Sequence, residues 1–118
     1  MRMLDEASFR NHADAALESL KRSLIQAEEQ GDFEAEEQSG ALNIVFEEPP
    51  GKFVITPNTP VRQIWISALS TSFKLDWSDD AEAFVLPKTG ETLKAVVERT
   101  INQHLGVDAG DGGAVSLD

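Results

Sequence analysis

Six carboxylates crowd into positions 28–37, and no basic residue stands among them. Carboxylate oxygens bind metal cations where neither a thiolate nor an imidazole is on offer. Glu34 and Glu36 alternate along a predicted strand, so they lie about 7 Å apart and can flank a cation. A tight site would need further ligands that converge on the same point, with supporting residues around them. We therefore expect several shared, exposed and weak sites, completed by Glu28, Glu29 and Asp32.

The same acidic run has two other interpretations. Charge runs are commonly solvated, and charges on a sheet edge discourage pairing with other sheets. The run also suits electrostatic docking on an arginine-rich partner. Which interpretation holds depends on the elements that position these acids.

Segment 59–67 contains the second informative pattern, a turn marked by Pro60 and followed by a predicted strand. Ile64 and Ile66 point to one side of that strand, and Gln63, Trp65 and Ser67 point to the other. If the isoleucines face the core, Trp65 is left in solvent between polar neighbours, and an exposed tryptophan often marks a contact surface. The alternative is the reverse orientation, in which the indole fills the core.

Length and composition limit the classes of protein. The chain has 118 residues, of which 41% are hydrophobic, enough for one domain with a modest core. Its formal net charge of −11 argues against nucleic acid as a partner, because phosphate binding relies on Lys and Arg. It contains no apolar run of about 18 residues and no apolar leader, so we expect a cytoplasmic protein without membrane contact.

Cysteine is absent from the chain, which excludes thiol catalysis, disulfides and cysteine-ligated metal centres within it. The two histidines, His12 and His104, are far apart in the sequence. We expect them at a helix flank and at a helix end rather than in a metal site. The acids are therefore the candidate metal ligands.

Hydrophobic periodicity predicts a helix, about six strands and a second helix. Apolar residues recur at helical spacing from about residue 5 to residue 27, and again from Leu93 to Leu105. Thr89 is the expected cap of the second helix, and Gly106 is its expected stop. Short alternating segments between turn residues predict an antiparallel meander, with strands at 33–38, 41–47, 52–56, 63–67, 72–77 and 83–86.

Each predicted helix has one apolar face, so both helices must cover sheet. The expected fold class is α+β, a two-layer α/β sandwich in which an antiparallel sheet of about six strands is covered on one face by the N- and C-terminal helices. We expect residues 1–106 to form this domain. Residues 107–118 are rich in Gly and Asp, and we expect them to be a disordered tail.

In several of the segments discussed above, the chain resembles the frataxin family, most closely its bacterial form. The resemblance runs from about Phe9 to Gly106, and the fold that it implies is the same sandwich. The segments that carry it are Gly40-Ala41-Leu42-Asn43-Ile44, Thr59-Pro60, Gln63-Ile64-Trp65-Ile66-Ser67 and Gly90-Glu91-Thr92.

The resemblance implies an iron-binding regulatory protein of iron–sulfur cluster assembly. Frataxins bind iron (Fe2+ or Fe3+) weakly and reversibly, dock on the complex of cysteine desulfurase and iron–sulfur scaffold protein, and are not enzymes in the ordinary sense. Carried over by position, the metal-binding acidic ridge comprises Asp14, Glu28, Asp32, Glu34 and Glu36, with Glu18 and Glu29 close enough to join it. The partner-binding sheet surface comprises Asn58, Gln63, Trp65 and Lys74.

Several positions depart from the family pattern and weaken the helix side of the expected ridge. This chain has Lys21, Arg22, Ile25 and Gln26 at helix positions where bacterial relatives have acidic residues. Glu37 falls where the first strand normally turns an apolar residue inward. We expect Glu37 at a frayed edge, because a buried unpaired carboxylate is costly.

The sequence is also compatible with two other functions. A carboxylate-bound ferroxidase or iron-storage-like enzyme would use the same acids, but such a centre usually needs histidine or bridging glutamates packed between helices. An acidic protein-interaction module without an iron role would keep only the docking surface. We expect a monomer, with iron-dependent oligomers as the alternative.

Overall fold

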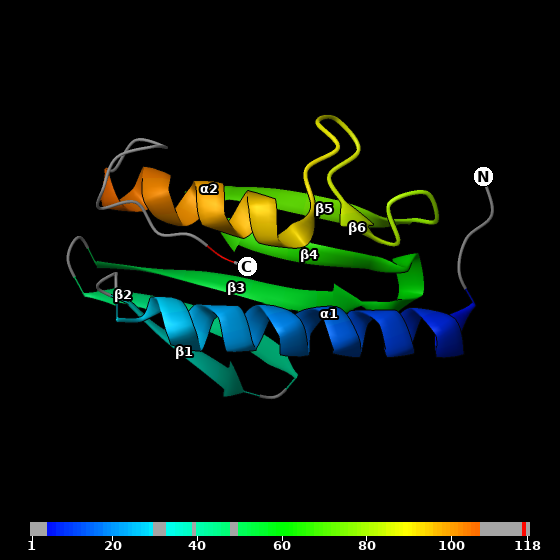
Figure 1. Cartoon of the computed structure of the whole chain (residues 1–118), viewed down its shortest axis with the longest axis horizontal. Coiled ribbons are helices and arrows are strands. Elements are labelled where there is room, and N and C mark those ends of the chain that lie inside the picture. Colours follow the sequence, from blue (N-terminus) through cyan, green and yellow to red (C-terminus); the bar gives the residue numbers. More distant parts are fainter. Residues whose placement is uncertain (1–4, 30–32, 39, 48–49, 107–116, 118) are drawn as a thin grey trace.

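The computed structural model describes residues 5–29, 33–38, 40–47, 50–106 and 117. They form two layers, a six-stranded sheet and two helices that lie on one of its faces (Figure 1). The expected α+β sandwich is confirmed. In chain order the elements are α1 (Glu6–Ala27), β1 (Phe33–Gln38), β2 (Ala41–Glu47), β3 (Pro50–Asn58), the short 3-10 helix η1 (Thr59–Val61), β4 (Gln63–Ala68), β5 (Thr71–Ser78), β6 (Ala83–Val85) and α2 (Leu93–Leu105).

The sheet is a meander in which each strand pairs with the next one along the chain, from β1 at one edge to β6 at the other. Every pairing is antiparallel, so short connections suffice. β3 and β5 are longer than predicted because they stay paired to their ends, where Asn58 lies opposite Gln63 and Ser78 opposite Ala83. β6 is short and pairs with the end of β5, from Asp76 to Ser78, and its last residue, Val85, also forms an isolated bridge with Thr92.

Side chains of the sheet alternate between a buried side under the helices and an open side. Ile64 and Ile66 are 0% and 1% exposed and belong to the hydrophobic core. β2 contributes Leu42, Ile44 and Phe46 to the same core. Gln63, Trp65 and Ser67, which alternate with the isoleucines, therefore lie on the open side, as predicted. The alternative in which the indole fills the core is wrong, since Trp65 is not part of the core cluster.

α1 begins at a capped end and buries one stripe. The Asp5 carboxylate accepts a hydrogen bond of 2.7 Å from the Ser8 N–H, which satisfies one of the free donors of the first turn. Its buried apolar residues are Phe9, Ala13, Leu20, Leu24 and Ala27. Asp14, Glu18 and Ile25 are exposed on the outer face of the helix layer.

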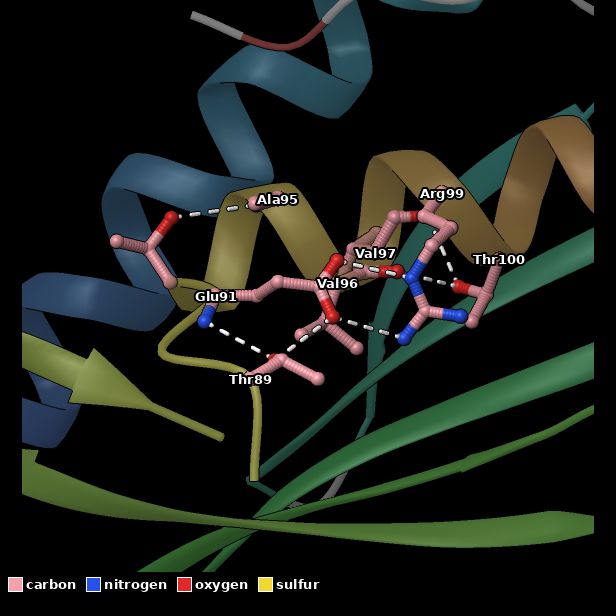
Figure 2. Close-up of polar contacts among 8 residues, drawn as sticks. Thr89, Glu91, Ala95, Val96, Val97, Arg99 and Thr100 are labelled. Atoms are coloured by element: carbon pink, nitrogen blue, oxygen red, sulfur yellow. Dashed lines mark hydrogen bonds and ion pairs between the residues drawn. The ribbon is translucent and has the colours of Figure 1, made fainter. Parts of the chain in front are cut away.

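The N-cap of α2 is Thr92, and the prediction of Thr89 was wrong. The Thr92 hydroxyl accepts a hydrogen bond of 3.3 Å from the Ala95 N–H. The Thr89 hydroxyl instead donates to the Glu91 carboxylate at 2.9 Å, inside the loop before the helix (Figure 2). The reason is Gly90, whose φ of +77° turns the chain between Thr89 and the first helical residue.

An ion pair holds the loop before α2 against the helix. Two guanidinium nitrogens of Arg99 donate to the Glu91 carboxylate, Nε at 2.9 Å and Nη2 at 3.1 Å (Figure 2). The hydrogen bonds from Arg99 lower the pKa of Glu91 below its usual value of 4.5. The Arg99 guanidinium also lies 5.7 Å from the Phe73 ring centroid, so it links the loop to β5.

The end of the chain returns to the helix layer. Gly106 adopts a left-handed φ of +73° and ends α2, as predicted. Leu117 is partly buried against the core, and its N–H donates to the Glu98 carboxylate at 2.9 Å. The rest of the predicted tail, 107–116 and 118, lies outside the described residues. Within the described chain, neither helix is long and apolar enough to cross a bilayer.

Candidate functional site

A chain of side-chain contacts lies on the open side, across β4 and β5. The Trp65 indole N–H donates to the Gln63 Oε1 at 2.9 Å. The Gln63 amide nitrogen donates in turn to the Asp76 Oδ1 at 2.9 Å. The Lys74 Nζ lies 4.9 Å from the Trp65 ring centroid, which is cation–π distance. We call Gln63, Trp65, Lys74 and Asp76 the Trp65 cluster.

Backbone pairing alone explains why these four side chains meet. The register of β4 and β5 places Trp65 opposite Lys74 and Gln63 opposite Asp76. Side chains of directly opposite residues on one face are near neighbours and interact. The indole is half-buried rather than fully exposed as expected, because Lys74 lies over its ring and Gln63 holds its polar edge. The cluster therefore presents a tryptophan in a fixed position.

Asn58, another predicted partner-binding residue, ends β3 immediately before η1 and lies opposite Gln63 in the register. The structure thus brings all four predicted partner-binding residues to the open side. Sequence reasoning missed Asp76, which accepts the hydrogen bond that orients Gln63. The spacing to Lys74 could have revealed it, because residues two positions apart in a strand lie on the same side of the sheet.

Glu34 and Glu36 are exposed on β1 and share the open side with the Trp65 cluster. They lie opposite Val45 and Asn43 of β2, while Phe33 before them is buried under the helices. The alternation predicted for this strand is therefore present. We call Glu34 and Glu36 the acidic edge, because β1 is the first strand of the sheet.

The acids expected to complete a metal site with this edge occupy different positions. Glu28 caps the C-terminus of α1, and its Oε1 accepts a hydrogen bond of 2.7 Å from the Ala35 N–H. That carboxylate therefore joins the end of α1 to β1. Glu29 is exposed directly after the helix, and Asp32 lies outside the described residues.

The helix acids Asp14 and Glu18 are exposed on α1, in the layer on the opposite side of the sheet from the acidic edge. The Lys21 Nζ lies 3.6 Å from the Glu37 Oε1, so a basic residue stands on the flank of α1 that meets β1. Glu37 is exposed on the edge strand β1, as predicted, but that edge is not frayed there, since Glu37 pairs with Leu42 and the strand runs on to Gln38. Because the Glu37 side chain is exposed, water solvates its carboxylate, and the ion pair with Lys21 adds little stability.

The predicted acidic ridge is therefore distributed over two surfaces. Across the described ranges, no three Asp, Glu, His or Cys side chains gather into a group that could hold a metal ion. The donor set is made of carboxylates alone, which suits weak exposed binding better than an enclosed site.

Both histidines take part in ring contacts. The His12 ring stacks on the Trp77 ring with centroids 3.9 Å apart, on the flank of α1. His104, in the last turn of α2, lies 4.2 Å from the Phe46 ring centroid. These are the helix-flank and helix-end positions that the sequence predicted.

Comparison with known proteins gives the family. A family model described as a frataxin-like domain matches residues 2–107. The iron-sulfur cluster assembly protein CyaY of Pseudomonas fluorescens (strain Pf0-1) is 29% identical over 105 residues, which cover 89% of this chain and 93% of that protein. CyaY of Pseudomonas putida (strain GB-1) is 28% identical over 104 residues, which cover 87% and 91%. The structure of frataxin from Psychromonas ingrahamii has the same fold, with a TM-score of 0.75 at 15% identity over 96% of this chain and 97% of that one. On the match of the family model, over a sheet and two helices arranged as in that structure, the chain belongs to the frataxin family.

Proposed function

We propose that this chain is an iron-binding regulatory protein of iron–sulfur cluster assembly. In this proposal it docks through its open side and acidic edge on the complex of cysteine desulfurase and iron–sulfur scaffold protein. The observation that carries the proposal is the Trp65 cluster, a fixed tryptophan on the sheet face that neither α1 nor α2 covers. The relatives named CyaY are iron–sulfur cluster assembly proteins, which supports the pathway.

The Trp65 cluster has the physical properties of a docking centre. Tryptophan is enriched among the residues that dominate binding energy at protein interfaces. Because hydrogen bonding to Gln63 already holds the indole, docking costs little conformational entropy at this position. Lys74 and Asp76 add one charge of each sign beside the ring, and such charges select the orientation of a partner.

The acidic edge contributes mainly through its electric field. Glu34 and Glu36 are exposed, and the whole chain carries a net charge of −11. A field of this sign attracts a basic partner surface and speeds encounter, and salt screens it. Docking should therefore slow as ionic strength rises, while the Trp65 contact should change little.

Iron binding is proposed for the same carboxylates. Glu34 and Glu36 alternate on one side of β1, about 7 Å apart by strand rise, and can flank a cation. A cation bound there neutralises part of the edge, so its occupancy changes the field that a partner meets. Weak and reversible iron binding would in this way regulate docking.

We propose that the regulatory role is not accompanied by an enzymatic one. Ferrous iron and oxygen, incubated with the protein, should give oxygen consumption at the rate of buffer alone. A protein-dependent rate that disappears in Glu34→Gln/Glu36→Gln would contradict this part of the proposal and favour a ferroxidase.

The test of the proposed function is a pull-down with the cysteine desulfurase of the same organism, with and without ferrous iron. Trp65→Ala should lose most of the retained desulfurase, and Glu34→Lys/Glu36→Lys should lose the response to iron. Ile25→Ala is the matched control, because Ile25 is 47% exposed on the helix layer, away from the open side. Equal retention by all variants, or no retention by the wild type, would overturn the proposal.

A further inference from the structure

The outer edge of β5 is only half covered. β6 pairs with Asp76 to Ser78, so the five preceding residues, from Thr71 to Leu75, face no strand of the described sheet on that side. Five residues of strand span about 16 Å. An unpaired strand edge offers backbone donors and acceptors to another extended chain.

A surface groove of about 640 Å³ runs along this edge. One wall is β5, with Phe73 and Lys74, and the other is the loop between β6 and α2, with Leu86, Pro87 and Lys88. In Figure 1 this loop rises in yellow from β6 beside β5 and returns to the start of α2. Its shape is held by the ion pair of Glu91 with Arg99. The groove therefore lies between this loop and an open strand edge.

The groove is basic in a strongly acidic protein. Three of the ten Lys and Arg residues of the chain line it, Lys74, Lys88 and Arg99. Arg99 is ion-paired with Glu91, and Asp76 is the one carboxylate among the described lining residues, so the groove has a small excess of positive charge, supplied by Lys74 and Lys88. Within the described residues, Lys88 forms no ion pair and is exposed. A ligand with negative charge is therefore favoured here and repelled elsewhere on the surface.

We propose that this groove binds an extended, acidic segment of a partner protein, which adds to the sheet as a strand beside Thr71 to Leu75. In such binding, backbone hydrogen bonds provide affinity and alternate side chains provide selectivity. Carboxylates on one side of the segment would face Lys74 and Lys88, and apolar side chains on the other would face Phe73 and Leu86. The inference rests on the proposed function, in which the neighbouring Trp65 cluster docks on the same partner.

The probe is a capped peptide of sequence VEVEVEV, titrated into the full chain while the backbone amide signals are followed by NMR. Saturable shifts should centre on Thr71 to Leu75 and on the loop from Leu86 to Thr89. Lys88→Glu should weaken binding about 3- to 10-fold, since it turns one exposed attraction into a repulsion. Lys52→Glu is the matched control, because Lys52 is exposed on β3 and the change in net charge is the same. It should weaken binding less than twofold.

Two further peptides separate backbone pairing from charge. VKVKVKV should not bind, and VEVEVEV that is N-methylated at alternate residues should lose the shifts at the edge of β5. Equal binding by the methylated peptide, shifts centred outside the groove, or equal effects of the two lysine variants would overturn the inference. Edge lysines can also discourage strand pairing, and that alternative predicts no binding at all. If the peptide fails while the desulfurase is still retained through Trp65, the inference is wrong and the proposed function is unaffected.

Discussion

The Trp65 cluster and the acidic edge lie on the same side of the sheet, but their side chains are held differently. In the Trp65 cluster, two hydrogen bonds of 2.9 Å and a cation–π contact join four residues across two strands. At the acidic edge, the side chains of Glu34 and Glu36 are exposed and have no hydrogen-bond or ion-pair partner within the described chain. The first region is a preorganised contact surface, and the second is a source of electric field.

The two regions should therefore control different quantities. Contact with a fixed indole determines how long a complex lasts, because it acts only at short range. The field of exposed acids acts over about 8 Å at physiological salt and determines how quickly partners and cations arrive. The predictions below separate these contributions, and they also separate either region from the core.

The largest expected effect distinguishes the two tryptophans. Trp65→Ala should weaken desulfurase binding by about 2 kcal/mol or more, with less than about 1 kcal/mol lost from the free energy of unfolding. Trp77→Ala should do the reverse and cost about 2–3 kcal/mol of unfolding free energy. The Trp77 ring packs against His12 and lies 5.3 Å from Phe84, whereas the Trp65 side chain belongs neither to the described core nor to the residues packed against it. Urea denaturation and a binding titration measure both quantities, and the same profile for the two variants would contradict the distinction.

The second expected effect concerns cations at the acidic edge. Ferrous iron under anaerobic conditions, at ten times its dissociation constant, should stabilise the wild type by about 1.4 kcal/mol. Glu34→Gln/Glu36→Gln should remove this gain and raise stability without iron, because repulsion between the acids is relieved. Asp80→Asn/Glu82→Gln, in the exposed turn between β5 and β6, is the control for the lost charge. Equal iron stabilisation in both double variants would place the cation elsewhere.

A third effect tests the hydrogen bonds inside the Trp65 cluster. Gln63→Leu should weaken desulfurase binding by about 1 kcal/mol, because the indole N–H loses its acceptor and Asp76 loses its donor. Gln38→Leu makes the same substitution at an exposed residue of β1 and should leave binding unchanged. If Gln63→Leu binds as the wild type does, the indole does not need to be held in place.

The smallest effect comes from an ion pair outside both regions. The pKa of Glu91 is lowered by the hydrogen bonds from Arg99, so the ionised carboxylate stabilises the fold. This contribution is present above the unfolded-state pKa near 4.5 and is lost as pH falls through the lower folded-state pKa. Glu91→Gln should therefore cost less than about 1 kcal/mol near neutral pH, and the cost should vanish on acidification.

Urea denaturation between pH 3 and pH 7 measures that dependence. Glu47→Gln, at an exposed carboxylate that ends β2, is the control and should show no such loss. A gap between Glu91→Gln and the wild type that grows as pH falls would contradict the lowered pKa.

Much of this arrangement could be predicted from local patterns. The alternation of Ile64, Trp65 and Ile66 determines which side of β4 is buried, because reversing it would put two isoleucines in solvent. Apolar periodicity likewise located both helices. These features depend on residues that are close together in the sequence, so one sequence is enough to predict them.

Other features depend on partners that lie far apart in sequence. Asp76 became part of the site because the register of β4 and β5 places it opposite Gln63. Thr89 and Thr92 are both good caps, and only the turn at Gly90 selects the second. The resemblance groups the helix acids Asp14 and Glu18 with the strand acids Glu34 and Glu36 in one ridge, yet two layers of the fold carry them. Their separation follows from the strand pairing of β1, which a charge count does not reveal.

The central claim is that the open side of the sheet, and not the helix layer, meets the partner. Hydrogen–deuterium exchange of this chain, free and bound to the cysteine desulfurase, tests it most directly. We predict added protection at the backbone amides from Asn58 to Ser67 and from Lys74 to Asp76, with α1 and α2 unchanged. Added protection confined to α1 and α2, with the open side exchanging as in the free protein, would contradict the account.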